Sequence, residues 1–158
     1  MGGGLHIIDL MLWINKSKVE KVIALGNKIS TQKSRFKYYD NVTALIKFKN
    51  GSTAKINSNF AGVTPHHHTF QVHGTKGTIF SNLSSNILVR SRNKKTKPKN
   101  INFSFKPKEK RGVLNSFIDQ IIKNKSCLVE RKDILNSINI GLAIEKSLKT
   151  KKWEKIRY

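Results

Sequence analysis

The sequence contains few residues that cross-link or interrupt a chain. It has one cysteine, Cys127, and three prolines among 158 residues. A single cysteine excludes a disulfide within the chain and supplies no metal-ligand spacing, and it suits the reducing cytoplasm, which is the location we expect. The length favours a single domain, residues 1–158, which buries about two thirds of the surface of its unfolded chain.

Long apolar runs are also missing. The longest candidate, residues 7–14, is interrupted by Asp9 and falls short of the ~18 uninterrupted apolar residues that a membrane-spanning helix needs. The glycine-rich amino terminus lacks the basic and then apolar order of a signal peptide, and His6 stands where an N-myristoylation motif has Ser or Thr. The sequence therefore predicts no contact with a membrane.

Acidic residues are scarce, because 9 Asp and Glu stand against 31 Lys and Arg, a formal net charge of +22. Such a balance is typical of proteins that bind nucleic acid or another anionic surface. The lysines, however, are spread over nearly every segment, and arginine, the better reader of bases and phosphates, is rare. An A/T-rich coding bias would give the same excess of Lys, Asn and Ile. Two denser patches, residues 90–99 and 106–111, are either polyanion contacts or solvated loops.

The first distinctive stretch is Gly-Gly-Gly-Leu-His-Ile-Ile-Asp-Leu-Met-Leu-Trp at residues 2–13. Its three glycines permit a tight backbone approach with positive φ. The apolar residues that follow have i, i+3, i+4, i+7 spacing, which predicts a helix with one buried face: Ile7, Leu10, Met11 and Ile14. His6 lies at the start of that helix, where an imidazole either acts as an acid/base group or merely caps and packs.

The middle of the chain predicts short strands. Asn50-Gly51 between two β-like runs indicates a hairpin, since both residue types tolerate positive φ. Residues 30–40 are polar and basic, and we expect a loop there. On the hairpin, Ile46 and Phe48 should share a face of one strand, and a second set should share a face of the other: Ala54, Ile56, Ser58 and Phe60. The expected strands are residues 19–25, 42–48, 53–60, 70–73, 78–80, 87–89, 101–105 and 153–158.

Helical periodicity returns in the last third of the chain, over residues 113–125 and 132–149. The second of these helices has two apolar stripes, which implies burial over a wide arc: Ile134, Ile138 and Leu142 on one, and Ile140, Ile144 and Leu148 on the other. A helix, a block of strands and two further helices predict an α+β fold, with helices on one face of a sheet. The other face of the sheet would then be covered by a contact between copies of the chain.

Three consecutive histidines follow Pro65. A strand would place His66 and His68 on one side and His67 on the other. Such a pair could bind zinc, but no cysteine and few carboxylates lie nearby in sequence, so a substrate contact or ordinary strand polarity is favoured over a metal site. The two glycines at positions 74 and 77 predict a turn, because a phosphate-binding loop has a longer glycine-rich run that ends in Lys-Ser/Thr.

The ordered set of segments resembles the carboxy-terminal domain of the Gfo/Idh/MocA family of NAD(P)-dependent sugar and inositol oxidoreductases. The resemblance covers nearly the whole chain. Besides residues 2–13, it is carried by Asn-Val-Thr-Ala-Leu-Ile-Lys-Phe-Lys-Asn-Gly at 41–51, His-His-His-Thr-Phe-Gln-Val-His-Gly-Thr-Lys-Gly-Thr at 66–78, Ser-Phe-Ile-Asp at 116–119 and Ala-Ile-Glu-Lys-Ser at 143–147. It implies an open, mainly antiparallel sheet with helices on one face, and homo-oligomers built on the exposed sheet face.

The same resemblance implies that His6 moves a proton at the substrate carbinol, with NAD or NADP as the cofactor. Relatives hold that cofactor mainly in an amino-terminal Rossmann domain, whose glycine fingerprint this sequence lacks, so no cofactor is expected to bind this chain alone. The chain is then a fragment or split subunit, completed by a separate Rossmann-domain chain. Many relatives have an aspartate four residues before this histidine, where Gly2 stands here; Asp9 is expected to be structural.

The segments look closest to members that act on sugars or nucleotide-sugars, and a lysine-rich surface around His66 and His68 would suit a diphosphate. Whether the chain is itself an enzyme stays open. One alternative is a non-catalytic interaction or oligomerisation module. A basic nucleic-acid-binding protein is less favoured, because the lysines are dispersed and no aromatic-rich RNA motif is present.

Overall fold

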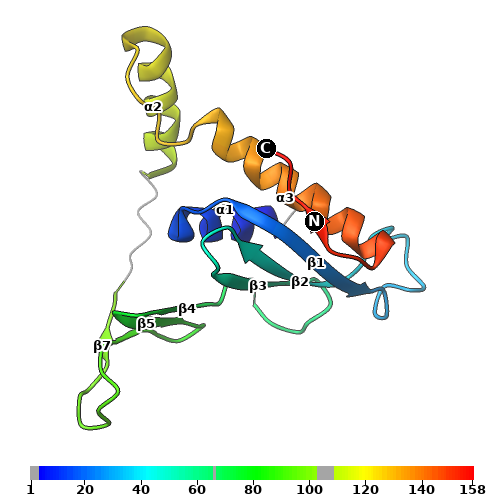
Figure 1. Cartoon of the computed structure of the whole chain (residues 1–158), viewed down its shortest axis with the longest axis horizontal. Coiled ribbons are helices and arrows are strands. Elements are labelled where there is room, and N and C mark those ends of the chain that lie inside the picture. Colours follow the sequence, from blue (N-terminus) through cyan, green and yellow to red (C-terminus); the bar gives the residue numbers. More distant parts are fainter. Residues whose placement is uncertain (1–3, 66, 103–108) are drawn as a thin grey trace. The chain divides into compact units, whose positions relative to one another are not determined.

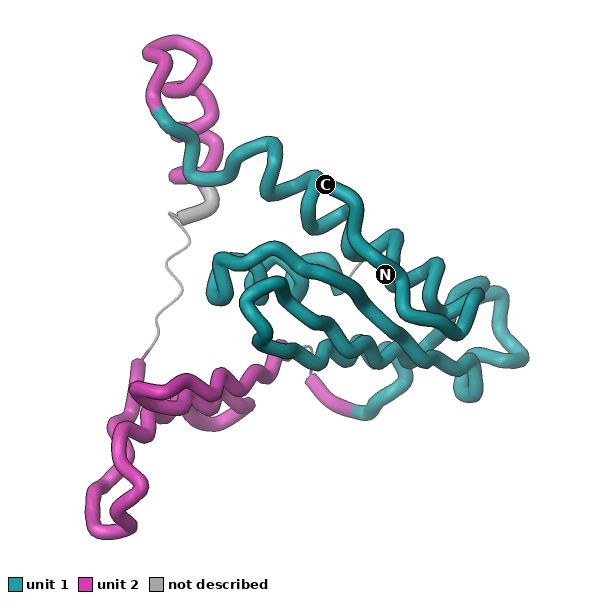
Figure 2. Tube along the Cα trace, in the orientation of Figure 1, with its two compact units in different colours: residues 1–63, 126–158 teal, residues 64–125 magenta. Residues whose placement is uncertain are grey.

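The computed structural model describes residues 4–65, 67–102 and 109–158. The helices and strands are labelled in Figure 1. The chain divides into two compact units, residues 1–63 with 126–158, and residues 64–125, which Figure 2 distinguishes by colour. Each unit contains its own four-stranded antiparallel sheet, and each is described by itself.

The first unit has two helices on one face of a sheet. Its strand order is β3-β2-β1-β8, and α3 packs on β1 while α1 packs on β3 and α3. The chain order of its elements is α1 (Gly4–Asn15), β1 (Val19–Asn27), β2 (Asn41–Phe48), β3 (Thr53–Asn59), α3 (Arg131–Thr150) and β8 (Glu154–Lys155).

Alternation along β1, β2 and β3, interrupted by a register shift between Val19 and Lys21 in β1, produces the core of this unit. Along β2 every second side chain is buried, whereas Leu25 of β1 and Leu45 of β2 on the opposite face are exposed. Ile46 and Phe48 share the buried face, as predicted, but Phe60 lies beyond the end of β3 and is exposed. The buried apolar residues are Ile8, Val19, Val22, Ala24, Val42, Ala44, Ile46, Phe48, Ile56, Ile140, Ile144 and Leu148.

The predicted hairpin between β2 and β3 is confirmed, with a different turn geometry from the one expected. Of the two turn residues Asn50 and Gly51, only Gly51 has positive φ, at 86°, and its N–H donates to the Phe48 carbonyl at 3.1 Å. Asn50 uses its side chain instead, and its carbonyl oxygen accepts hydrogen bonds from Ser52. Asn15, at the end of α1, exchanges hydrogen bonds with Ser52 and Asn50, so the helix end is attached to the turn.

The helix faces chosen from periodicity were only partly right. In α1, Ile8 is fully buried, whereas Ile14 is exposed. Nearly every position of α1 is apolar, so the spacing could not identify the buried face. The approach of α3 selects it: a Cβ at Gly141 would lie 3.0 Å from Leu5 Cδ2. In α3 one predicted stripe is buried and the other is exposed, namely Ile134, Ile138 and Leu142.

The second unit has strand order β4-β5-β6-β7 and the helix α2. Thr75 and Lys76 form the predicted turn, because Gly74 pairs with Gly77. The last strand is Lys99–Asn100 instead of residues 101–105, of which 103–105 lie outside the described residues. The bounds are β4 (Phe70–Gly74), β5 (Gly77–Ser81), β6 (Asn86–Val89), β7 (Lys99–Asn100) and α2 (Glu109–Lys123). The apolar face of α2 is exposed: Val113, Leu114, Phe117, Ile118, Ile121 and Ile122.

The predicted fold class is confirmed, since the chain combines antiparallel sheets with three helices in an α+β arrangement. The strands are divided between two sheets, a detail that strand spacing alone does not reveal. None of the helices within the described residues has the length and hydropathy to cross a bilayer.

The hydroxyl of Ser147 joins three parts of the first unit. Its oxygen accepts a hydrogen bond from the Ala24 N–H at 2.9 Å, and its proton is donated to the Lys152 carbonyl at 2.7 Å. Strand β8 pairs with β1 only at Lys21 and Val22, so Ser147 replaces the missing strand at Ala24. The side chain is fully buried, and this single group therefore satisfies backbone groups that water cannot reach easily.

A second contact fixes the loop of residues 28–40 between β1 and β2. The Asp40 carboxylate is buried and accepts hydrogen bonds from the Thr31 N–H at 2.8 Å and the Thr31 hydroxyl at 3.1 Å. Burial by itself would raise the pKa of this carboxyl, but the hydrogen bonds from Thr31, Ser30 and Ile29 together hold the pKa below its usual 3.8. The ionised form of Asp40 is therefore part of the folded loop.

We expect Ser147→Ala to lower the free energy of unfolding by about 1–3 kcal/mol, because the buried Ala24 N–H loses its acceptor. The measurement is urea unfolding followed by circular dichroism. The control is Ser116→Ala on α2, whose hydroxyl donates to a carbonyl of its own helix, and it should change stability by less than about 0.5 kcal/mol. Equal effects of the two substitutions would contradict the bridging role.

Because the folded pKa of Asp40 is lowered, its stabilising effect is complete above pH 3.8 and is lost as the pH falls below that value. Asp40→Asn should reduce stability at neutral pH, and the variant should lose less stability than the parent as the pH falls below 3.8. Urea midpoints measured from neutral pH to below 3.8 test the prediction, with Asp119→Asn on α2 as the control. An Asp40→Asn variant that loses as much stability as the parent on acidification would contradict this prediction.

Candidate functional site

His6 lies in the first turn of α1 and is exposed. Its neighbours in the helix, Leu5 and Ile8, pack into the core, so the backbone that carries the imidazole is fixed. Within the described residues, no hydrogen bond or ion pair engages the His6 ring. The structure thus presents the ring on a rigid element with its nitrogens available to a ligand.

Asp9 lies one helical turn after His6 and is in contact with α3. The Ser137 hydroxyl on α3 contacts the Asp9 carboxylate at 3.4 Å and donates to the Asp133 carbonyl at 3.0 Å. The carboxylate therefore helps to hold α1 against α3, close to where Gly141 allows the two helices to approach.

The start of α1, which carries His6, is directed toward a definite end of the first sheet. The end of α1 is attached to the β2–β3 turn through Asn15, and the short connection of residues 16–18 reverses the chain into β1. Helix α1 and strand β1 run in opposite directions, which can be followed in Figure 1. The His6 end of α1 is therefore directed toward the end of the sheet where β1 stops and the loop of residues 28–40 begins.

Exposed aromatic side chains gather at that end of the sheet. The Phe36 ring lies 5.9 Å from the Tyr38 ring and 6.3 Å from the Phe60 ring, measured between centroids. Phe36 and Tyr38 belong to the loop of residues 28–40, and Phe60 follows β3. The sequence prediction treated residues 30–40 only as a polar loop; the run Tyr38-Tyr39-Asp40 was the available signal, but the contact with Phe60 could not be read from the sequence.

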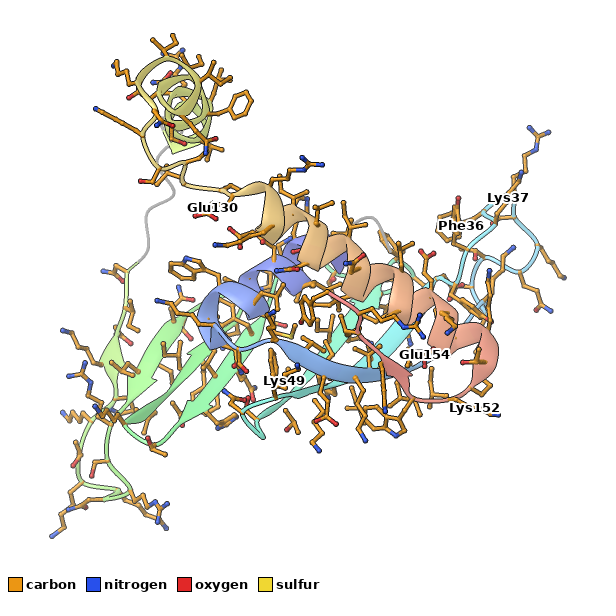
Figure 3. The ribbon with its side chains drawn as sticks, turned by 45° about the horizontal axis from the view of Figure 1, so that its top comes forward. Phe36, Lys37, Lys49, Glu130, Lys152 and Glu154 are labelled. Carbon is orange, nitrogen blue, oxygen red and sulfur yellow. The ribbon has the colours of Figure 1, made fainter. Side chains whose placement is uncertain are left out.

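A groove between α3 and β8 offers less chemistry. Its carboxylate, Glu154, accepts hydrogen bonds from Lys146 Nζ at 2.6 Å and the Thr150 hydroxyl at 2.9 Å, and both lower the pKa of Glu154. Figure 3 labels Glu154 beside the end of α3. These polar groups are paired with one another, so the groove is best explained as part of the packing of the carboxy terminus.

The histidine segment belongs to the second unit. His66 lies outside the described residues, and His68 is exposed just before β4. The stretch is not a strand, since β4 begins at Phe70, so the expected alternation of these histidines does not apply to the part that is described. The basic loop of residues 90–98 is exposed, and residues 106–108 lie outside the description.

The described residues do not form a site for a metal or for a dinucleotide. Nowhere among them do three His, Cys, Asp or Glu side chains gather. All the strand pairs described are antiparallel, and no glycine-rich turn connects a strand to a helix, which is how Rossmann domains hold a pyrophosphate.

Comparison with known proteins agrees with this fold. Residues 1–80 match the GFO/IDH/MocA C-terminal domain family. No curated protein matches the chain. Several solved oxidoreductases share the fold over almost the whole of this chain, although the sequences are distant and the likeness therefore concerns the fold alone.

Three of these structures illustrate the likeness. A levoglucosan dehydrogenase in complex with NADH and levoglucosan has a TM-score of 0.81 and 17% identity over 98% of this chain and 49% of its own. The aldose-aldose oxidoreductase from Caulobacter crescentus, complexed with glycerol, has a TM-score of 0.78 and 16% identity over 97% and 46%. The WlbA dehydrogenase from Bordetella pertussis, with NADH and UDP-GlcNAcA, has a TM-score of 0.72 and 18% identity over 100% and 45%.

The chain thus spans about half the length of the solved structures that it matches. The matched family segment contains α1 with His6, the complete hairpin and strands β4 and most of β5. The resemblance seen in the sequence is confirmed by this match and by the fold. The chain belongs to the GFO/IDH/MocA C-terminal domain family.

Proposed function

We propose that this chain is the substrate-binding half of an oxidoreductase that acts on a sugar or nucleotide-sugar. In this proposal, NAD or NADP is held by a nucleotide-binding domain outside the described residues. The observation that carries the proposal is His6, an exposed imidazole on a rigid helix start, inside the segment that matches the family.

The neighbouring structures support the class of substrate. Levoglucosan is bound with NADH in one of them, and UDP-GlcNAcA with NADH in another. A third is an aldose-aldose oxidoreductase. These ligands share a carbinol that a dehydrogenase oxidises, and oxidation requires a base for the hydroxyl proton. An imidazole accepts a proton near neutral pH, so His6 would take the proton from the carbinol oxygen and return it in the reverse direction.

An apolar stripe on α3 supports a partner domain. Ile134, Leu135, Ile138 and Leu142 are all exposed along one side of the helix, although their spacing is that of a buried face. Contiguous apolar surface of this kind is typical of a contact with another protein. A nucleotide-binding domain is the partner that we propose for it.

The face of the first sheet that carries no helix supports self-association. Leu25 and Leu45 are exposed there, with Ile23 beside them and lysines around the edge. A second copy of the chain would cover this face by packing sheet against sheet.

We expect His6→Ala to lower kcat by about 10²- to 10⁴-fold, because the carbinol loses its base. The assay combines the chain with a nucleotide-binding domain of the same family and follows NAD(P)H with a panel of aldoses and UDP-sugars. His73→Ala, which changes another exposed histidine on β4, should leave kcat unchanged. Substrate contact by His68 would appear as a higher KM in His68→Ala at constant kcat.

An unchanged kcat in His6→Ala would contradict the role of the imidazole. Absence of turnover in the parent chain with every sugar would contradict the function itself. It would favour a non-catalytic interaction module, the alternative that the sequence left open.

We expect Leu45→Glu to convert the assembled protein to a monomer, because a carboxylate would be buried at the centre of the contact between sheets. Size-exclusion chromatography with light scattering measures the change. Thr96→Glu, in an exposed loop of the second unit, adds the same charge and should leave the oligomer intact. A parent chain that is monomeric at all concentrations would refute the contact.

A further inference from the structure

We propose that the exposed rings of Phe36, Tyr38 and Phe60, together with the surrounding cations, bind the nucleoside diphosphate part of a nucleotide-sugar. We call this surface the aromatic–cationic face, and its cations are Lys28, Lys33, Arg35 and Lys37. The base would stack on the rings and the diphosphate would lie against the cations. The inference rests on the proposed function and narrows its substrate class.

The rings form a platform in spite of their exposure to water. Phe36 is 37% exposed, Tyr38 is 68% exposed and Phe60 is 60% exposed. The centroid of the Phe36 ring nevertheless lies only 5.9 Å from that of Tyr38 and 6.3 Å from that of Phe60. They come from two loops that are distant in sequence, so the cluster is a product of the fold. Exposed aromatic faces of this kind stack with nucleobases, since every base has a π-face.

The charges on this face are all of one sign. Within the described residues, Lys28, Lys33, Arg35 and Lys37 take part in no ion pair. The only acidic residue of the loop is Asp40, whose buried carboxylate is already used by Thr31. The positive potential is therefore not neutralised locally, and a diphosphate complements it.

The platform is held in place by the loop that carries it. Phe60 donates its N–H to the Asp40 carbonyl at 2.8 Å, and Asp40 donates its own N–H to the Asn27 carbonyl at 3.0 Å. Tyr39 packs over Gly26, where a Cβ would lie 3.2 Å from the ring, and Lys151 Nζ lies 5.9 Å from the centre of the same ring. A fixed loop loses little conformational freedom when a ligand binds.

The position of the face suits a substrate that must also reach His6. Both the loop of residues 28–40 and the first turn of α1 are directed to the end of the sheet opposite the β2–β3 turn. The sugar of a nucleotide-sugar extends from the diphosphate, and in this proposal the base is held on the rings while the carbinol reaches the imidazole.

A long nucleic-acid strand fits these observations less well. The other exposed basic loop, residues 90–98, contains no aromatic residue, so it offers no group on which a base could stack. Single-strand binding proteins repeat their aromatic groups along a groove that follows the backbone. One cluster accommodates a mononucleotide.

The test is titration of UDP into the full chain by isothermal calorimetry, with uridine and pyrophosphate as part-ligands. We expect UDP to bind more tightly than either part. Phe36→Ala should lower the affinity for UDP at least ten-fold through loss of stacking. Lys37→Glu should lower this affinity several-fold and make it less dependent on salt concentration. The matched control is Lys49→Glu, in the turn at the opposite end of the sheet, which should change affinity less than two-fold; Figure 3 labels all three positions.

Pyrophosphate binding as tightly as UDP, or an unaffected Phe36→Ala variant, would overturn the proposal, because charge alone would then explain the affinity. Oligouridylate that binds far more tightly than UDP would overturn it in favour of single-stranded nucleic acid, and absence of UDP binding would also overturn it. If UDP fails to bind while the assembled enzyme oxidises a free aldose, the result would support the proposed function and contradict nucleotide binding by the aromatic–cationic face. UDP binding with the expected variant pattern, but without sugar turnover, would support the face and contradict the oxidoreductase.

Discussion

The packing of the second half of α3 on β1 is the contact on which the first unit depends. Ile140, Ile144 and Leu148 fill the space between helix and sheet, and they are almost completely buried. Ser147 lies among them and satisfies the backbone of β1 where β8 has already ended. The core can therefore be apolar up to its edge without leaving a buried N–H group unpaired.

Two candidate features follow from this packing, because it fixes what lies at one end of the sheet. Helix α1 is held between the hairpin turn and α3, which presents His6 on a rigid backbone. The loop after β1 is held by Asp40, which brings Phe36 close to Phe60. The proposed proton transfer and the proposed nucleotide contact thus rely on the same core. A substitution such as Ser147→Ala would affect both features by changing the position of β1.

The exposed apolar faces have a different meaning. Sequence periodicity predicted an amphipathic helix over residues 113–125 and burial for both stripes of α3, yet among the residues that the structure describes only one stripe, on α3, is covered. Periodicity reports that a face is apolar, but it does not say whether the cover comes from the same chain or from another protein. The exposed stripe of α3 is the surface that the proposed partner domain would cover.

The sequence by itself determined the fold class, the hairpin at Asn50-Gly51, most of the strands and the family to which the segment around His6 belongs. These are local properties, because alternation, turn residues and helical spacing act between near neighbours. Only the tertiary structure decided which face of α1 is buried, where Ser147 and Asp40 direct their polar atoms, and that Phe36 meets Phe60. Those contacts join segments that are distant in the chain, and their geometry is set by packing, which no local pattern encodes.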